Sequence, residues 1–258
     1  MRYRRPPVKI RTRPASSSRP SGFAGAGSCS DEMHAGQRVR VPLVSDRAAW
    51  LQELCAGAGG PVAHLGCADS PYTSELLAAG VLLHEQLVGV ASVTGFDVDP
   101  VGLGLLRERM GTQRFVLADV TAEIPEPELE RFALVVAGEV LEHVADADAF
   151  LRGCRRLLAP DGRLCVTVPN ACSPKVGLRS LAGRESVHPD HRVYYSPRTL
   201  QRTLSGAGYD VLLTATCLAP IAGRAGRLIF NPLLRASHRA FEGPVGEGLI
   251  AIARAQRR

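Results

Sequence analysis

Acids and histidines with the potential for chemistry gather in two short stretches, "GEVLEHV" and "ESVHPDHRVYYS". If the first stretch is helical, Glu139, Glu142 and His143 stand at positions i, i+3 and i+4 and share one face. The second stretch would bring His188 and His191 to the same place from a later segment. Carboxylates and imidazoles move protons near neutral pH and bind divalent metals, so the two stretches together predict a chemical centre.

Three interpretations of this centre stay open. Glu142 and His143 could orient a loop that closes over a ligand. Alternatively, His143 or His191 acts as a general base for a substrate hydroxyl, and we take these two histidines as the candidate catalytic residues. In the third interpretation, two carboxylates and two histidines bind a divalent metal that grips substrate oxygens, and the metal itself stays unassigned.

Apolar runs alternate with helical stretches around these residues. Strands are expected at residues 62–66, 92–99, 114–120, 132–140 and 163–170, with a sixth after the helix that starts near 196 and a last one at 247–254. Helices are expected at 47–57, from the pair Ser70-Pro71 to about 90, at 100–110 and from about 147. This alternation is typical of an α/β fold with a Rossmann-like, doubly wound, mostly parallel sheet of seven strands and helices on both faces.

Small or acidic residues stand where the first four strands end. The first strand ends at Gly66, the second at Asp97, the third at Asp119 and the fourth at Gly138-Glu139. Ligands of open α/β sheets bind at the carboxyl ends of the strands. A carboxylate there can accept two hydrogen bonds from the hydroxyls of a ribose, and the helix after the first strand offers free N–H groups.

Four stretches in this order, "VAHLGCADS", "GFDVD", "ADV" and "ALVVAGEVLEHV", resemble the motifs of class I S-adenosyl-L-methionine-dependent methyltransferases, over about residues 60–210. His64 stands where that family has an acid, and Ala68 and Ser70 replace two glycines. The resemblance implies S-adenosyl-L-methionine as cofactor, with Asp97 on the ribose, Asp119 on the adenine and Asp69 on the ammonium group. The implied cofactor-binding residues are Gly66, Cys67, Ala68, Asp69, Asp97, Val98, Asp119, Val120, Gly138 and Glu139.

We therefore expect a methyltransferase that acts on a hydroxyl of a small molecule or glycan. The run Glu-x-x-Glu-His with a later histidine also resembles metal-dependent 2′-O-methyltransferases of RNA ends, which is one alternative. A second alternative is a methyltransferase fold that only binds, as the altered first motif would allow. A nicotinamide-dependent oxidoreductase is disfavoured because the pattern G-x-G-x-x-G is missing.

The composition of the chain predicts a basic tail followed by one domain. Residues 1–20 carry seven of the 31 positive charges and no acid, which leaves the rest of the chain at −1 and argues against nucleic acid as a partner of the folded part. We expect residues 1–40 to be a disordered basic tail and 41–258 to be one domain, with substrate-side insertions at 171–195 and 218–245. Seven scattered cysteines without a C-x-x-C pair predict reduced thiols, and no apolar run is long enough for a membrane span, so we expect a cytoplasmic protein.

Overall fold

The structure is a computed structural model, and it describes residues 39–122, 124, 126–129, 131–185, 187–218 and 231–256. These residues belong to one compact unit that begins at Val39. The expected tail therefore lies outside the described residues, apart from Val39 and Arg40. Val41 is already buried and donates its backbone N–H to the carbonyl of Glu242, so it belongs to the folded unit.

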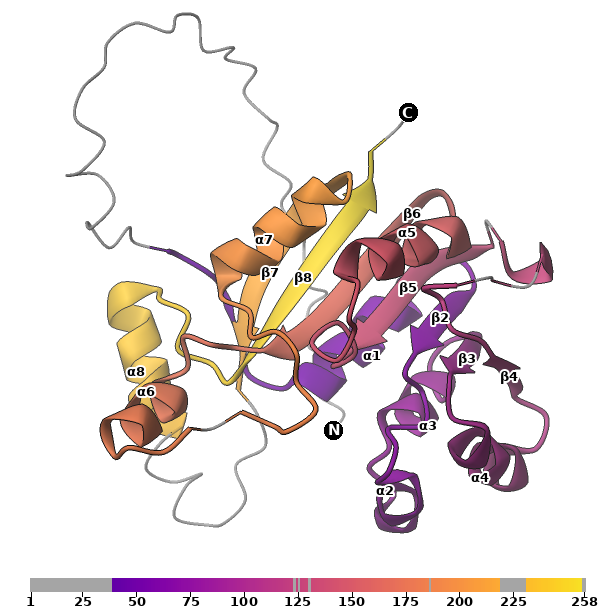
Figure 1. Cartoon of the computed structure of the whole chain (residues 1–258), viewed down its shortest axis with the longest axis horizontal. Helices are drawn as coiled ribbons and strands as arrows, with labels where there is room; N and C mark the ends of the chain where they lie inside the picture. The colour runs from indigo at the N-terminus through magenta and orange to yellow at the C-terminus, as the bar shows by residue number, and fades with distance from the viewer. Residues whose placement is uncertain are drawn as a thin grey trace, which may run out of the picture. The chain divides into compact units, whose positions relative to one another are not determined.

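One sheet organises the unit, with the strand order β1-β7-β8-β6-β5-β2-β3-β4 (Figure 1). The bounds are β1 Leu43–Val44, β2 Val62–Leu65, β3 Val93–Asp97, β4 Arg114–Leu117, β5 Phe132–Gly138, β6 Leu158–Pro169, β7 Tyr209–Cys217 and β8 Gly248–Ala255. Neighbours pair in parallel except where β8 runs antiparallel to both β6 and β7. The mostly parallel sheet is confirmed, but the predicted number of strands was wrong because β1 adds a short eighth strand at the edge.

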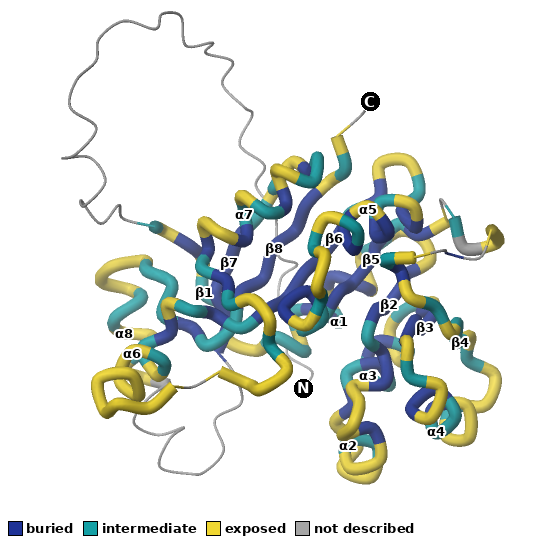
Figure 2. The backbone as a smooth tube through the Cα atoms, viewed as in Figure 1, coloured by how far each residue is buried: buried dark blue, intermediate teal, exposed yellow. Residues whose placement is uncertain are grey.

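Helices lie on both faces of the sheet. Their bounds are α1 Arg47–Ala56, α2 Thr73–Ala79, α3 Leu83–Val88, α4 Pro100–Met110, α5 Ala147–Leu157, α6 Pro174–Leu181, α7 Pro197–Gly206 and α8 Asn231–Phe241, with a 3-10 turn at Glu126–Glu128. The buried side chains of α5 and α7 pack on one face, and those of α1 and α3 pack on the other. The inner strands are therefore buried on both faces (Figure 2), as their unbroken apolar sequences predict.

The helix predicted to open at Ser70-Pro71 begins later and is interrupted. Ser70 donates its hydroxyl to Asp99 instead of capping a helix, and its peptide bond to Pro71 is cis. The helix α2 starts only at Thr73 and stops at Gly80, which adopts a left-handed φ of 64°. The short helix α3 follows it, so one predicted helix is two.

The stretch "GEVLEHV" is a turn and not a helix, which corrects the helical spacing expected for Glu139, Glu142 and His143. Glu139 has a positive φ of 55°, which no residue inside an α-helix adopts. Helix α5 begins later, after Asp146, whose carboxylate accepts a hydrogen bond from the N–H of Ala149 at 2.8 Å.

Both predicted insertions contain a helix. The stretch 171–195 holds α6, and the described part of 218–245 holds α8, while residues 219–230 lie outside the description. Among the described residues, no helix has the length and apolar character that a membrane crossing requires. Five of the six described cysteines are buried, Cys172 is exposed, and all six are free thiols, as expected.

Candidate active site

A first cavity, of about 230 Å³, opens where β2, β3 and β4 end. It brings together five of the residues predicted to bind a cofactor, namely Gly66, Asp97, Val98, Asp119 and Val120. The remaining predicted residues do not line it. Asp97 is buried and accepts hydrogen bonds from the backbone N–H groups of Ala68, at 2.8 Å, and Asp99, at 3.0 Å. One acid thus fixes the turn after β2 to the end of β3.

The turn after β2 stays tight although two glycines of the expected motif are replaced. Gly66 has a φ of 71°, and a Cβ there would lie 2.5 Å from the side chain of Val140, so only glycine fits. Ala68 is fully buried, and its methyl group faces Gly102 of α4, where an added Cβ would come within 2.7 Å. The methyl group of Ala68 therefore fits because Gly102, opposite it on α4, has no side chain.

The side chains of Cys67 and Asp69, both predicted to bind the cofactor, lie in different surroundings. Cys67 is buried and packs in a small apolar cluster with Leu82, Leu103 and Leu106, so only its backbone is available to a ligand. Asp69 is exposed and has a left-handed φ of 56°. The structure places it at the outer end of the turn.

His64, which stands where the resembling family has an acid, is a core histidine in an apolar strand. It is 2% exposed, and its Nδ1 lies 3.1 Å from Nδ1 of His84, with the two rings stacked. Burial lowers the pKa of both imidazoles, that of His84 to about 4. Both rings are therefore neutral at pH 7, and the N–H of one ring donates a hydrogen bond to the ring nitrogen of the other.

A second cavity, of about 320 Å³, is lined by Glu139, which does not line the first. Glu139 accepts a hydrogen bond from the hydroxyl of Thr167 at 2.9 Å and forms an ion pair with Arg47, at the start of α1. Arg47 was missed from the sequence, because nothing in the pattern of α1 sets it apart from the other arginines. Glu139 follows the last residue of β5, and Thr167 lies on the parallel neighbour β6, so the two strands place both residues together beside Arg47.

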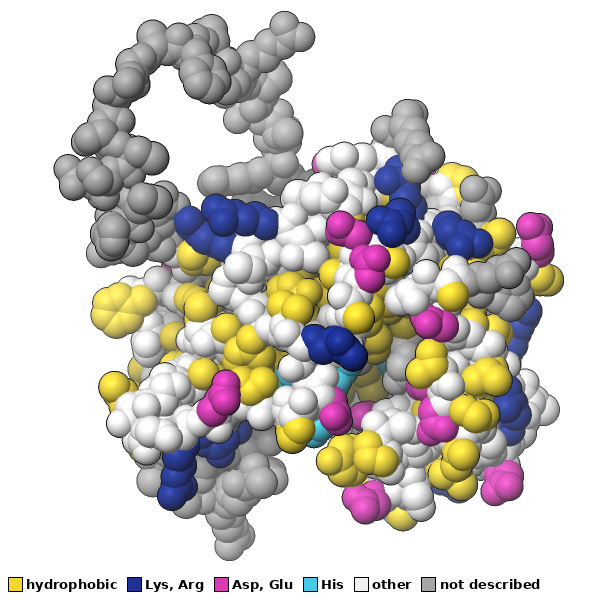
Figure 3. All heavy atoms as spheres, in the orientation of Figure 1, with side chains coloured by type: hydrophobic (Ala, Val, Ile, Leu, Met, Phe, Trp, Pro, Cys, Tyr) yellow, Lys and Arg dark blue, Asp and Glu magenta, His cyan; other side chains and the backbone are white. Residues whose placement is uncertain are grey.

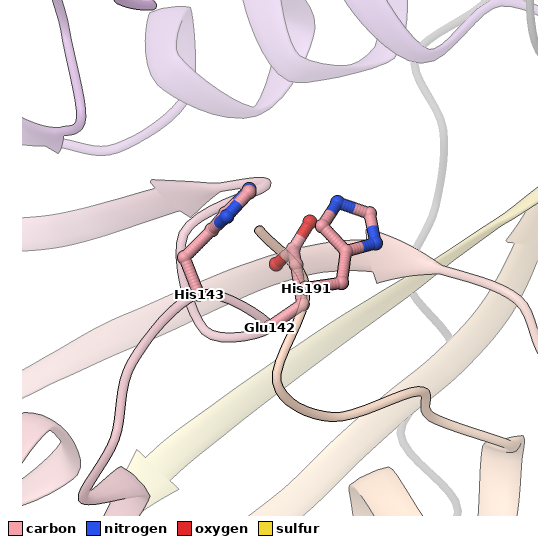
Figure 4. A group of neighbouring side chains, drawn as sticks. All are labelled: Glu142, His143 and His191. Carbon is pink, nitrogen blue, oxygen red and sulfur yellow. The ribbon is translucent and has the colours of Figure 1, made fainter. Parts of the chain in front are cut away.

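The chemical centre predicted from the two acidic and histidine-rich stretches forms between these cavities. Glu142, His143 and His191 each offer one ligand atom, and these atoms all lie within 4.8 Å of one another (Figure 4). His143 lines the first cavity and His191 lines the second. Figure 3 shows histidine side chains reaching the surface near the centre of the view. The group of Glu142, His143 and His191 therefore borders both cavities.

Backbone contacts hold the two stretches together. The N–H of Arg192 donates to the carbonyl of Glu142 at 2.8 Å, and Nδ1 of His143 lies 3.2 Å from the carbonyl of Asp190. The ring of His188 lies 5.3 Å from that of His191, but His188 does not belong to the group of converging ligand atoms. Glu139 does not belong to it either, since its carboxylate is bound by Arg47 and Thr167; the predicted convergence of four residues is corrected to three.

Glu142 has an unusual environment for a carboxylate. It is completely buried, and neither of its side-chain oxygens has a hydrogen-bond partner among the described residues. Burial, reinforced by the nearby charge of Glu139, raises the pKa of Glu142 to about 8. Burial also lowers the pKa of His191, with further contributions from His143 and His188. A proton, or a cation that replaces it, is needed to balance this carboxyl group.

A mostly parallel sheet with a cavity at its strand ends, and a cluster of titratable side chains beside that cavity, is an arrangement typical of α/β proteins that bind a ligand at this edge of the sheet. The family model described as a methyltransferase domain matches residues 47–214, which is more than half of the chain. The chain belongs to this family, the class I S-adenosylmethionine-dependent methyltransferases.

Known proteins similar to the chain agree with this family. The ubiquinone biosynthesis O-methyltransferase of Pseudomonas putida strain GB-1 is 28% identical over 144 residues, or 55% of this chain, and the chain spans 57% of the length of that relative. The small RNA methyltransferase HEN1 is 18% identical with a TM-score of 0.54, covering 82% of this chain and 25% of HEN1. The CMeT domain of the citrinin polyketide synthase is 15% identical with a TM-score of 0.50, covering 82% of this chain and 52% of that chain. At these identities the two structures show a shared fold.

Proposed function

We propose that this protein transfers a methyl group from S-adenosylmethionine to a hydroxyl oxygen of a small molecule or glycan. The observation that carries the proposal is the position of Glu142, His143 and His191 between two cavities, one of which is lined by strand-end acids. The 28% identity to an O-methyltransferase supports oxygen as the acceptor atom. The net charge of −1 outside residues 1–20 favours a small acceptor over an RNA end.

In this proposal the adenosine part of the cofactor occupies the first cavity. Asp97 accepts hydrogen bonds from the ribose hydroxyls, and Asp119 with Val120 contacts the adenine. The tight turn at Gly66 leaves room for a close approach of the cofactor to the backbone, which supports the fit. Arg47 and Glu139 are already an ion pair, and a guanidinium beside a carboxylate suits the carboxylate and the ammonium group of a methionine.

The proposed role of the centre is to activate the acceptor. When bound, S-adenosylmethionine supplies a methyl group on a positively charged sulfur, which the acceptor oxygen takes by in-line displacement while sulfur keeps the bonding electrons. Alignment and exclusion of water are then the main tasks of the protein. His143 takes the proton that leaves the acceptor hydroxyl and passes it to solvent, while Glu142, which keeps its own proton at pH 7, stays buried between His143 and His191.

A divalent metal is a second way for the same centre to activate a hydroxyl. One carboxylate and two imidazoles are a donor set that suits such an ion, and the unpartnered oxygens of Glu142 fit this use. Glu142, His143 and His191 would hold the ion, and it would lower the pKa of an acceptor oxygen bound to it.

The cofactor is tested by calorimetry. S-adenosylhomocysteine should bind, whereas NADH should not; the reverse result would favour an oxidoreductase, and no binding of either would leave a methyltransferase fold that only binds other ligands. Activity is then measured by methyl transfer from labelled S-adenosylmethionine to a panel of hydroxylated metabolites.

Variants separate the roles of the histidines. His143→Asn should reduce turnover by about a hundredfold or more, as expected for loss of a general base. His188→Asn is the matched control, because His188 neighbours the centre without joining it, and it should retain most of the turnover. A chelator should abolish turnover only if a metal is used, and Mg²⁺ or Mn²⁺ should then restore it. Normal turnover of His143→Asn would show that the centre only shapes the loop.

A further inference from the structure

The start of α6 contains a serine whose hydroxyl has no evident structural use. Ser173 is 4% exposed, and its Oγ has no hydrogen-bond partner within the described ranges. It occupies the N-cap position of α6, where serine usually accepts a hydrogen bond from the first amides, yet it makes no such bond. A buried hydroxyl without a partner is destabilising, so a partner that arrives with a ligand is the simplest explanation.

The same end of α6 is positively charged and faces the second cavity. Ser173, Lys175 and Val176 all line this cavity. Lys175 is the only lysine after residue 9, in a chain that uses arginine 29 times. Its ammonium group lies 3.2 Å from the carboxylate of Glu247, which also lines the cavity. This ion pair uses one of three ammonium protons, and the helix dipole adds a partial positive charge at the same point.

The charges that line the cavity cancel before a ligand arrives. The pair of Arg47 with Glu139 and the pair of Lys175 with Glu247 leave no net charge. A bound cofactor with a sulfonium, an ammonium and a carboxylate adds one positive charge next to this cavity. An acceptor with one negative charge would restore neutrality, and the unpartnered Ser173 beside Lys175 is a place to hold it.

We propose that the start of α6 is an oxyanion subsite, in which Ser173 and Lys175 hold a carboxylate or phosphate group of the acceptor. This inference rests on the proposed methyl transfer and adds the substrate class: a hydroxylated small molecule that also carries an oxyanion. Val176, Pro169 and Leu218 provide apolar contacts for the part of the acceptor between its two polar ends. The subsite fixes which hydroxyl reaches the centre around Glu142.

The test uses three probes that differ only in the group under question: 4-hydroxybenzoate, 4-hydroxyphenyl phosphate and the neutral 4-hydroxybenzamide. Their binding to the full chain saturated with sinefungin, an unreactive cofactor analogue in which a protonated amine takes the place of the sulfonium charge, is measured by calorimetry. At least one of the two anions should bind about tenfold more tightly than the amide, as expected for one charge-assisted hydrogen bond. The stronger anion identifies the oxyanion as a carboxylate or a phosphate. Equal affinities, or no binding of any probe, would overturn the subsite.

Two variants connect this preference to the subsite. Ser173→Ala and Lys175→Met should each reduce the preference for the anion about three- to tenfold and leave the affinity for S-adenosylhomocysteine unchanged. The matched control is Ser180→Ala, since Ser180 is exposed on the same helix and its hydroxyl donates to Val176. If both variants keep the full preference for the anion, the subsite is refuted. The affinity for S-adenosylhomocysteine tests the methyltransferase proposal separately.

Discussion

Replacing Glu142 by glutamine should stabilise the protein at neutral pH. The pKa of Glu142 is about 8 in the folded protein, against 4.5 for an ordinary glutamate. At pH 7 the folded state must therefore keep a proton that the unfolded state has released. The 2.5 pH units between 4.5 and 7, at about 1.36 kcal/mol each, correspond to roughly 3 kcal/mol of lost stability. A neutral glutamine of similar shape avoids this loss.

The pH dependence has a defined sign. Because the folded pKa of Glu142 is raised, its unfavourable contribution is absent below pH 4.5 and grows as the pH rises toward 8. Urea unfolding of the wild type and of Glu142→Gln should therefore differ by roughly 3 kcal/mol at pH 7 and by less than about 1 kcal/mol at pH 5. Both proteins are measured with EDTA, since a cation at the centre would stabilise the carboxylate.

Glu53→Gln on the exposed side of α1 is the matched control, and it should change the free energy of unfolding by less than about 0.5 kcal/mol at either pH. A Glu142→Gln protein that is no more stable than the wild type at pH 7 would refute the reasoning. An equal gain at pH 5 and pH 7 would do the same, because the effect would then not come from the titration of Glu142.

Three further predictions concern the parts of the fold that position the site. Asp97→Asn should weaken the binding of S-adenosylhomocysteine about tenfold or more by calorimetry, since a charge-assisted hydrogen bond is worth about 1.5–3 kcal/mol; unchanged affinity would contradict the ribose assignment. Gly153→Ala should lower the free energy of unfolding, measured by urea titration, by about 3 kcal/mol, because the added Cβ would lie 1.8 Å from the carbonyl oxygen of Val120. Gly104→Ala on α4, which has open space around it, is the control and should be neutral or stabilising. The folded pKa of His84 is about 4, so the free energy of unfolding should fall as the pH drops below 6.5, by about 2 kcal/mol at pH 5. His84→Gln should remove this part of the pH dependence. An unchanged slope of unfolding free energy against pH in the variant would contradict the prediction.

The order of strands and helices could be predicted from the sequence because each element carries its own signal. The strand β5 is an unbroken apolar run, β2 is apolar except for His64, and Pro100 after Asp99 marks the start of α4. The positions of Asp97 and Asp119 follow from the same pattern, since each comes at or just after the end of a strand. Local sequence was therefore sufficient to place these two acids at the ends of their strands.

Local signals failed where a distant residue competes for the same group. Ser70 followed by proline is a typical helix start, but its hydroxyl is bound by Asp99, 29 positions later, and the helix begins further on. The short strand β1 was missed because two residues carry no periodicity, and only its pairing with β7 defines it. In both cases the deciding contact joins segments that the sequence alone does not bring together.

The group of Glu142, His143 and His191 depends both on local sequence and on a contact between distant segments. Three of the residues singled out in the sequence converge, but the helical spacing that grouped them was wrong, because the chain turns at Glu139. Glu142 and His143 nevertheless meet His191, since the amide of Arg192 donates to the carbonyl of Glu142 and ties the later stretch to the turn. A helix would have satisfied this carbonyl itself and left it no bond for the second stretch. The turn is therefore what allows the two stretches to form one site.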